Sequence, residues 1–465
     1  MGLVTISVAL TAAEMSALLP VTGGFIVHAH EFVDPALGAA TGWNWAYALA
    51  IVQAVEIVAS TLLVQYWTNA IPKVLLITIF WGTIVLVNLM PLRAFGEMEF
   101  VFGSMKISLV IFLVILGIVL DLRADPQGER LGFSYWKRDA FKEFAYSDIV
   151  VHGIKGRILA VTSTLLNAAF AFAHIQIIAI AGGETQNSRQ AIPNALRRTS
   201  IGVFALYISV IFTVGLILPS THPGLQSSTG TALSSPFVIA AKQAGINSVA
   251  SFINAVVLTS AFSAGITSVF ISSQALVALA KSQHAPAILG KTNANGVPVV
   301  AVLTVSSFGA CAYLSLQEST VTAFWWLVSL SAAAGLVSWC VLCCGYLRLL
   351  EGMRVQGYLR DDLPYRAPLQ PFLAWFALFG CVFTLIFGGC TVFLPGNFRL
   401  ADFLTNYANV FIFAGLYFTF KFAKESKVVQ PAEMVLRIHF DAVQKESLLK
   451  QQAGQYALVP NDAST

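Results

Sequence analysis

Long, uninterrupted runs of apolar residues recur along this chain and constrain its fold more than any other feature. A helix needs about 20 apolar residues to cross a hydrocarbon core of about 30 Å, and these runs are too long for the strands of a membrane barrel. Because 57% of the residues are apolar and only 11% are charged, the composition is not that of a soluble domain. Turn-forming or charged residues bound the runs, which are 2–19, 43–67, 71–90, 99–120, 159–182, 200–219, 248–280, 297–316, 323–350, 371–394 and 406–422. The sequence predicts an all-α polytopic membrane protein with about 11 transmembrane helices.

Lysine and arginine are unevenly distributed between the two sets of loops that this topology creates. They are more numerous on the side that holds the C-terminus, whereas the basic residues of the long polar segment 121–158 are balanced by acids. Since short basic loops stay in the cytoplasm, we expect a cytoplasmic C-terminal tail, an extracellular 121–158 loop and an N-terminus that faces outward. The balanced charge gives no support for a nucleic-acid partner.

The sequence motifs of nucleotide-driven and hydrolytic enzymes are missing from the chain. It contains no Walker loop and no GxGxxG, HExxH or GxSxG pattern, so we expect neither an enzyme nor a bound cofactor. The segment HAHEFVDP supplies four possible metal ligands, but histidines two positions apart make a poor tetrahedral set. We therefore expect no metal site.

Two acidic residues lie inside the predicted spans, where a charge costs about 2.5–3.5 kcal/mol and requires a partner or a function. Glu14 is close to the end of its span, so we favour an interfacial acid that caps neighbouring backbone groups over a proton relay. Glu56 lies in mid-span, with Gln53 one turn earlier on the same face. We expect it to face the bundle interior, either as a structural hydrogen-bonding group or as part of a pathway.

Two further polar sites interrupt apolar helices. Lys106 lies about two turns into its helix, where snorkelling to the interface is strained. We therefore favour a buried ammonium that replaces a coordinated cation or carries a proton. His174 and Gln176 interrupt the segment NAAFAFAHIQIIAIAGGE. They are compatible with ordinary interhelical hydrogen bonds and equally with a locally loosened helix that faces a cavity.

Seven segments, in order along the chain from Ala13 to Val435, are more specific than any single residue. They are GWNWAYALAIVQAVEIVASTLLVQYWT, FGEMEFVFGSMKISLVIFLVILG, LGFSYWKRDAF, AGGETQNSRQAIPNALRR, SAFSAGITSVFISSQALVALAKSQHAP, TNANGVPVVAV and LPYRAPLQPFLAWFALF. Together they closely resemble the fungal amino acid permeases of the amino acid–polyamine–organocation superfamily. The resemblance implies a LeuT-like fold of two inverted five-helix repeats, with the first and sixth helices broken at mid-membrane, followed by two further helices.

The opening segment TAAEMSALLPVTGGF resembles the end of the family's second helix. The resemblance therefore implies that the first helix, which carries a carboxylate-binding Gly-Thr/Ser-Gly segment, is missing, and that the eleven expected spans are twelve minus one. The implied organisation is a remnant of the first repeat with four helices at 1–120, an extracellular loop at 121–158, a second repeat with five helices at 159–350, a cytoplasmic loop at 351–370, the last two helices at 371–422 and a cytoplasmic tail at 423–465.

The resemblance also suggests which residues bind the substrate. The family usually shows Phe-x-Gly-Thr-Glu in its sixth helix, and the substrate amine is expected near the matching residues of this chain, which are Phe172, Ala173, His174, Ile175 and Gln176. The run Ser260–Gly265 resembles a Ser-Ala-x-Ser-Ala-Gly segment of the eighth helix and places Ser260 and Ser263 among the intramembrane polar residues. Lys106 aligns with a fifth-helix lysine that occupies the place of a sodium ion in proton-coupled relatives, so the resemblance assigns coupling to it.

These features predict an amino acid permease in the plasma membrane that works by alternating access and is coupled to protons. The expected partners are an amino acid substrate, protons and the lipid bilayer. The loop LGFSYWKRDAFKEF looks closest to the dicarboxylic amino acid permease branch. The alternative is a truncated or sensor-like homologue that does not transport.

Overall fold

The computed structural model describes residues 1–122, 132–138, 142–146, 149–180, 185–226, 235–246 and 248–457, so parts of the predicted 121–158 loop lie outside the described residues. Helices dominate these residues. The α-helices are α1 (Gly2–Leu18), α2 (Phe25–Phe32), α3 (Pro35–Val64), α4 (Lys73–Asn88), α5 (Leu92–Leu122), α6 (Ser134–Arg138), α7 (Gly153–Ser163), α8 (Leu165–Phe172), α9 (Ile177–Ile180), α10 (Ser188–Ile217), α11 (Pro223–Gln226), α12 (Pro236–Gln243), α13 (Ser248–Lys281), α14 (Val299–Ser306), α15 (Thr320–Val355), α16 (Phe372–Phe387), α17 (Leu400–Ala423) and α18 (Leu436–Ala457). The 3-10 helices are η3 (Ala287–Gly290), η4 (Ser307–Leu316), η5 (Arg360–Asp362) and η6 (Cys390–Phe393), and the strands are β1 (Phe144–Tyr146) and β2 (Ile149–Val151).

The apolar helices agree with the predicted spans. Among the described residues, nine helical segments are long and apolar enough to cross a membrane, and the two shorter apolar helices α1 and α4 occupy the positions of two further predicted spans. Asp34 illustrates how the sequence starts one of the longest of them, because its carboxylate accepts the Ala36 N–H at 2.9 Å and Pro35 occupies the first turn of α3. The prediction of an all-α polytopic fold is confirmed.

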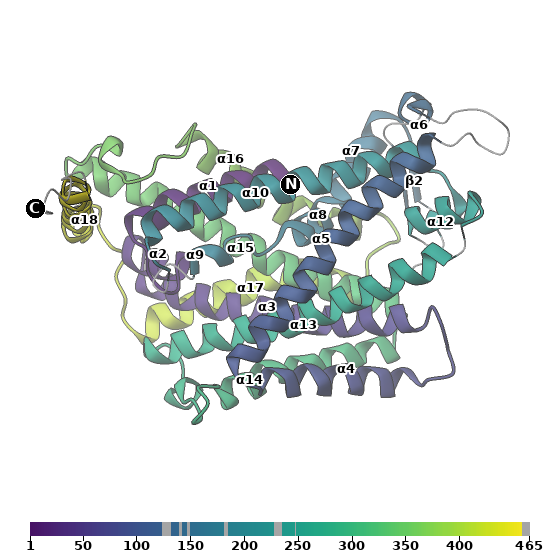
Figure 1. Ribbon diagram of the computed structural model, residues 1–465, viewed down its shortest axis with the longest axis horizontal. Helices are drawn as coiled ribbons and strands as arrows, with labels where there is room; N and C mark the ends of the chain where they lie inside the picture. Colours follow the sequence, from purple (N-terminus) through teal and green to yellow (C-terminus); the bar gives the residue numbers. More distant parts are fainter. Residues whose placement is uncertain are drawn as a thin grey trace, which may run out of the picture.

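Most of the long helices run roughly along the horizontal axis of Figure 1, and α5 crosses the bundle obliquely. Helices α3 and α15 are mostly buried and pack against each other, whereas α5 and α17 expose most of their apolar side chains. This is the pattern of a bundle whose inner helices contact protein and whose outer helices contact lipid.

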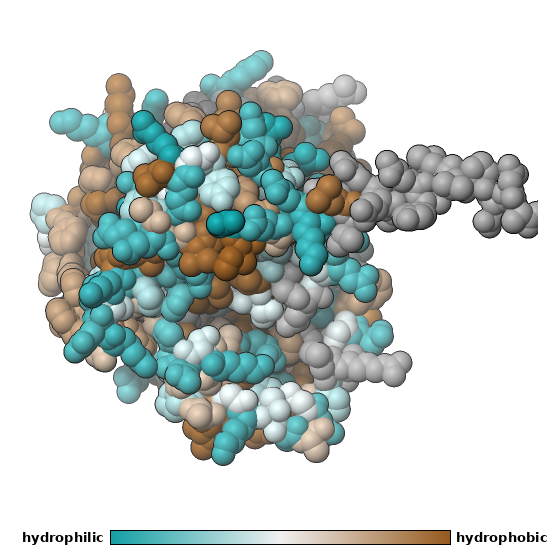
Figure 2. Space-filling model, turned by 90° about the vertical axis from the view of Figure 1, so that its left-hand side faces the viewer, coloured by the Kyte–Doolittle hydropathy of each residue, from teal (hydrophilic) through white to brown (hydrophobic). Residues whose placement is uncertain are grey.

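The two ends of the bundle differ. At the right in Figure 1 lie α6, α12 and the β1–β2 hairpin, in which Phe144 pairs with Val151; we call this the loop end. At the left lie α2 and α18, which we call the tail end. Figure 2 views the tail end directly and shows hydrophilic side chains spread over it around a smaller apolar area. Polar residues therefore cover this end of the bundle.

Met1 lies part way along the bundle in Figure 1 rather than at the loop end. Helix α1 has 17 residues, which span only about 25 Å. The hydroxyl of Thr384 on α16 lies 3.5 Å from the Met1 sulfur, so the half-buried Met1 side chain packs against α16. The side of the membrane that this terminus faces stays a prediction.

Candidate functional site

The helical segment 153–180 is interrupted at the residues that the sequence singled out. Helix α8 ends at Phe172 and α9 begins at Ile177. Between them Ala173 adopts an extended backbone (φ −56°, ψ 155°) and His174 a left-handed one (φ 70°). A left-handed conformation costs an L-residue about 1–2 kcal/mol, so surrounding contacts must hold this break in place. The structure therefore shows the loosened helix that the sequence left open as one of two alternatives.

Aromatic residues of two inner helices surround the break. Trp339 of α15 donates its indole N–H to Oε1 of the fully buried Gln176 at 2.7 Å. The Trp45 ring of α3 meets the His174 ring edge-on, with centroids 5.0 Å apart. On the outer side, the Tyr207 hydroxyl donates to the Ala171 carbonyl at 2.9 Å, which satisfies an acceptor that the broken helix leaves without its usual partner.

Several polar atoms at the break have no hydrogen-bond partner within the described protein. They are both ring nitrogens of His174, Nε2 of Gln176 and Nε1 of Trp45. Buried donors and acceptors normally find partners, and each orphan costs about 1–3 kcal/mol. Such a cluster can bind a small molecule that carries both donors and acceptors.

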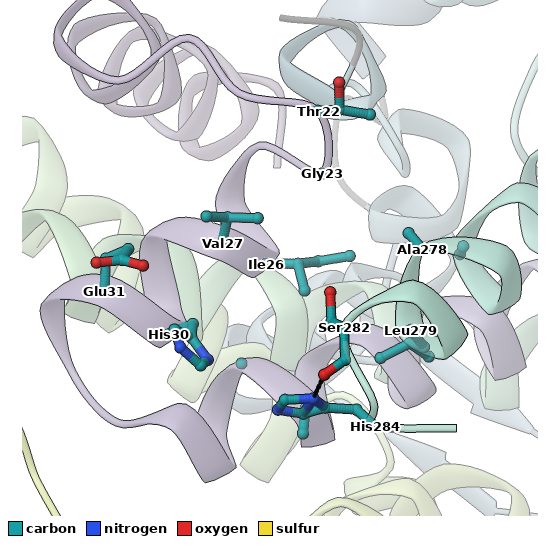
Figure 3. A pocket seen from close by; sticks show the side chains of 13 residues that line it. Thr22, Gly23, Ile26, Val27, His30, Glu31, Ala278, Leu279, Ser282 and His284 are labelled. Carbon is teal, nitrogen blue, oxygen red and sulfur yellow. Dashed lines mark hydrogen bonds between the residues drawn. The ribbon is translucent and has the colours of Figure 1, made fainter. Parts of the chain in front are cut away.

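A pocket of about 320 Å³ lies between the α1–α2 turn, α2, the start of α3 and the end of α13 (Figure 3). The turn between α1 and α2 forms one wall, and its Gly23 N–H donates to the Ile180 carbonyl at the end of α9 at 3.0 Å. Polar groups come from His30 of α2 and from His284, which follows α13, and their rings lie 5.8 Å apart. Burial, followed by the nearby His30, lowers the pKa of His284, so the ring favours its neutral form. The pocket is thus large enough for an amino acid, and one hydrogen bond links its Gly23 wall to the end of α9.

Lys106 forms part of a second polar cluster, between α5 and α13. Its Nζ donates to the Ser263 hydroxyl at 3.2 Å and lies 3.9 Å from Oε1 of Glu99. Ser263 is fully buried, whereas the side chains of Lys106 and Glu99 are 30% and 35% exposed. The ammonium is therefore half-buried and lies near a carboxylate, because Glu99 is two turns earlier on the same helix face. Its predicted role as a cation substitute or proton carrier stays a prediction.

The other two intramembrane residues on α3 and α13 have different surroundings. Glu56 lies beside Gly265, where an added Cβ would come within 3.4 Å of the Glu56 Cβ, and it is close enough to Lys106 to interact electrostatically. It faces the bundle interior, as expected. Ser260 is half-buried, one turn before Ser263 on α13.

Glu14 occupies a different environment from the one predicted. It is completely buried, and its two oxygens accept from the Arg360 Nε and Nη2 at 2.8 and 2.9 Å, from the Tyr346 hydroxyl at 2.9 Å and from the Ala367 N–H at 2.8 Å. The bond from Ala367 satisfies a backbone N–H of the segment that follows α15. The depth of Glu14 in the membrane stays a prediction. The hydrogen bonds to Glu14 raise the pKa of the Arg360 guanidinium, which stays charged. Glu14 therefore anchors α1 to α15 and to the segment that follows α15.

Several residues of these clusters were not identified from the sequence, among them Glu99, Trp45, Trp339 and Arg360. Glu99 had a detectable signal, since it lies seven positions before Lys106 and thus on the same face of α5. Trp45, Trp339 and Arg360 had none, because their partners lie far away along the chain and nothing in the local pattern connects them.

Comparisons with known proteins agree with this architecture. The amino acid permease family profile matches residues 1–432. A basic amino-acid permease of Saccharomyces cerevisiae is 33% identical over 423 residues, which are 90% of this chain and 73% of the relative. A proline-specific permease of Emericella nidulans is 34% identical over 410 residues, which are 87% of this chain and 74% of the relative.

A solved structure shows the same fold. The manganese transporter of Eremococcus coleocola, solved in complex with an aromatic bis-isothiourea substituted compound, superposes with a TM-score of 0.55 at 14% identity, and covers 95% of this chain and 88% of the transporter. The likeness in shape supports the transporter fold alone, while the family profile and the relatives supply the class of activity. The chain is a multi-pass membrane transporter, not an enzyme, and it belongs to the amino acid permease family.

Proposed function

We propose that this chain moves an amino acid across the plasma membrane by alternating access, in symport with protons. The observation that carries the proposal is the helix break at Ala173–Gln176, with orphaned polar atoms of His174, Gln176 and Trp45 around it. A break of this kind frees main-chain groups in mid-membrane, where they can bind the charged ends of a zwitterion.

In this proposal, main-chain groups and side chains at the break bind the substrate. The main-chain groups from Phe172 to Gln176 would hold the substrate amine, together with the His174 ring and the Gln176 amide. The Phe172 ring packs on Tyr207, with centroids 4.8 Å apart, and gives the break an apolar wall. The pocket of Figure 3 would then be the tail-end route to this site.

Coupling is assigned to Lys106. An ammonium that can gain and lose a proton inside the bundle is able to change the charge of the α5–α13 contact during the transport cycle. Its hydrogen bond to Ser263 links that charge to a second helix.

The substrate class proposed is a dicarboxylic amino acid. This class rests on the resemblance of the loop LGFSYWKRDAFKEF to the dicarboxylic branch. The described partners of the break, Trp45, Trp339 and Tyr207, are uncharged, so they offer no carboxylate to pair with a cationic side chain and no cation to pair with an acidic one. The relatives reported above are named for basic amino acids and for proline, so these substrates are the direct competitors to be compared.

The test is uptake of labelled glutamate, lysine and proline by a permease-deficient fungal host that expresses the chain, at two external pH values. The proposal expects glutamate uptake that increases as the medium is acidified. Uptake of lysine or proline alone would contradict the substrate class and leave transport standing. Absence of uptake from a chain that reaches the plasma membrane would overturn transport, and retained amino acid binding by that chain would favour the sensor-like alternative.

A further inference from the structure

Four side chains link α5 to α13 in the membrane. Oε2 of Glu99 accepts from the Ser263 hydroxyl at 2.9 Å and from the Thr267 hydroxyl at 2.8 Å, while Lys106 Nζ donates to the same Ser263 oxygen at 3.2 Å. Glu99 and Lys106 lie two turns apart on one face of α5, and Ser263 and Thr267 one turn apart on one face of α13. The Ser263 hydroxyl therefore bridges a cation and an anion.

The direct ion pair is weaker than this bridge. At 3.9 Å, Lys106 Nζ and Glu99 Oε1 lie at the limit of an ion pair, whereas both hydrogen bonds through the fully buried Ser263 have ordinary lengths. Among the side chains that the structure describes, the charged group beside Glu99 is Lys106 on its own helix, and Glu56 of α3 interacts with Lys106; on α13 the contacts are hydroxyl groups. Glu99 is thus the carboxylate that a hydrogen-bonded hydroxyl joins to Lys106.

We propose that Glu99 is a proton-accepting member of the coupling site, reached from Lys106 through the Ser263 hydroxyl. This inference rests on the proposed proton symport. The Lys106 ammonium gives a proton to the Ser263 oxygen, and the hydroxyl proton passes to Glu99 Oε2. The products are a neutral amine, an unchanged hydroxyl and a carboxylic acid, so the net charge is conserved, and the reverse transfer restores the ion pair.

The transfer would lower the cost of moving α5 past α13. Separating an ion pair inside the bundle leaves two charges in a medium of low dielectric constant, whereas a neutral amine and a carboxylic acid lose only hydrogen bonds. The Thr267 hydroxyl can donate to the carboxylate and can also accept from the carboxylic acid, so it serves both protonation states. In this scheme Thr267 supports Glu99 but lies outside the path of the proton.

The first test compares Glu99→Gln with Glu97→Gln, its neighbour on the exposed side of α5. At equal surface amounts, Glu99→Gln should lower the maximal uptake rate roughly tenfold or more and flatten its dependence on external pH, because an amide cannot accept the proton. Glu97→Gln should stay within about twofold of the unmodified chain. Glu99→Asp, which keeps the acid, should recover part of the pH dependence.

The second test separates a relay from a structural contact. Ser263→Ala removes the bridge and should reproduce the loss of pH dependence, whereas Thr267→Ala should change the rate and leave the pH profile in place. Infrared difference spectra of purified protein give a readout that does not depend on transport or on equal surface amounts. A carboxylic acid band that appears on acidification should be lost in Glu99→Gln and kept in Glu97→Gln.

The outcomes distinguish this inference from the function on which it rests. An unmodified chain that transports, together with a Glu99→Gln variant of unchanged rate and pH profile, overturns the relay and leaves the symport intact. Equal effects of Ser263→Ala and Thr267→Ala on the pH profile also overturn it, since a structural contact would use both hydroxyls. Absence of uptake by the unmodified chain overturns the symport itself.

Discussion

Two polar clusters lie two turns apart on the same face of α15 and differ in their hydrogen bonding. At the tail end, Tyr346 donates to Glu14, and both oxygens of that buried carboxylate are fully engaged by Arg360 and the Ala367 N–H. At the break, Trp339 donates to Gln176, but Nε2 of Gln176 and both nitrogens of His174 have no partner within the described protein. One cluster is complete and the other has free hydrogen-bonding capacity.

The difference assigns the two clusters to different tasks. A buried carboxylate with four donors joins α1 to α15 and to the segment that follows α15, more than 300 positions later in the sequence, which is the behaviour of a structural anchor. Orphaned polar groups destabilise a fold and persist where a ligand can use them. Substitutions in the Glu14 cluster should therefore reduce the stability of the protein, and substitutions at the break should reduce uptake with little effect on stability.

Arg360→Ala should give the largest loss of stability. It leaves the fully buried Glu14 carboxylate without its guanidinium partner, and removal of one member of a buried pair costs about 3–5 kcal/mol. The expected results are a large fall in the thermal unfolding temperature of the purified protein and retention of the chain inside the host cell.

Arg366→Ala is the matched control in the same segment. Arg366 pairs with Asp361, and the two side chains are 55% and 78% exposed, so the loss should stay below about 1 kcal/mol. Equal destabilisation by the two substitutions would mean that the Glu14 cluster is not an anchor.

His174→Gly should have the opposite profile. Glycine adopts φ 70° without steric cost, which stabilises the folded chain, but it loses more conformational entropy on folding, which destabilises it. The free energy of unfolding should therefore change by no more than about 1 kcal/mol. Because the imidazole is lost from the proposed site, uptake should fall roughly tenfold, to be measured as the initial rate at equal surface amounts.

Gln283→Gly provides the control for backbone effects. Gln283 has a similar left-handed backbone (φ 59°), just beyond the end of α13. Its replacement should leave the uptake rate within about twofold of the unmodified chain. A His174→Gly variant that transports normally would show that the imidazole takes no part in substrate binding.

The fold was largely predictable from the sequence because apolar run length is a local property. The bounds of α13 (Ser248–Lys281) and α16 (Phe372–Phe387) lie close to the runs 248–280 and 371–394. The break at His174 was also detectable, since two polar residues interrupt a strongly apolar helix and the resemblance pointed to the same residues.

The partners inside the bundle were not predictable, for a physical reason. Glu14 and Arg360 are 346 positions apart, and a contact of that kind depends on how whole helices pack. The position of Glu14 near the end of a span predicted an interfacial group, but it gave no sign that Arg360 and Ala367 of the segment after α15 would bury the carboxylate. The Glu99–Lys106 pair, in contrast, follows from helical periodicity alone.

The packing of the tail extends the anchoring cluster and should contribute a smaller free energy. Arg189 of α10 donates through Nη1 to the Ala17 carbonyl at the end of α1 at 2.9 Å, and through Nε to Glu446 of α18 at 2.9 Å. Glu446→Gln should therefore loosen α18 by about 0.5–1.5 kcal/mol. Faster amide hydrogen exchange in residues 436–446 would measure the effect.

Asp441→Asn is the corresponding control on α18. Its pair with Arg437 spans 3.8 Å between two exposed side chains, and such pairs contribute about 0.3–0.5 kcal/mol. If both substitutions accelerate exchange equally, Arg189 does not hold the tail.

Acidification should loosen the same segment slightly, through His439 of α18. Burial, opposed in part by the nearby Glu31 and reinforced by Arg189, lowers the pKa of His439 below its ordinary value of 6.5, so the packed tail favours the neutral ring. The stabilising effect of the neutral form is complete above the ordinary pKa and is lost as the pH falls through the window below 6.5. Exchange in residues 436–446, corrected for its intrinsic pH dependence, should therefore be faster at about pH 5.5 than at about pH 7.5. His439→Asn removes the titrating ring and should abolish the difference in exchange rate between the two pH values, whereas Asp441→Asn should retain it. A difference that persists in His439→Asn would assign the pH response to a group other than His439.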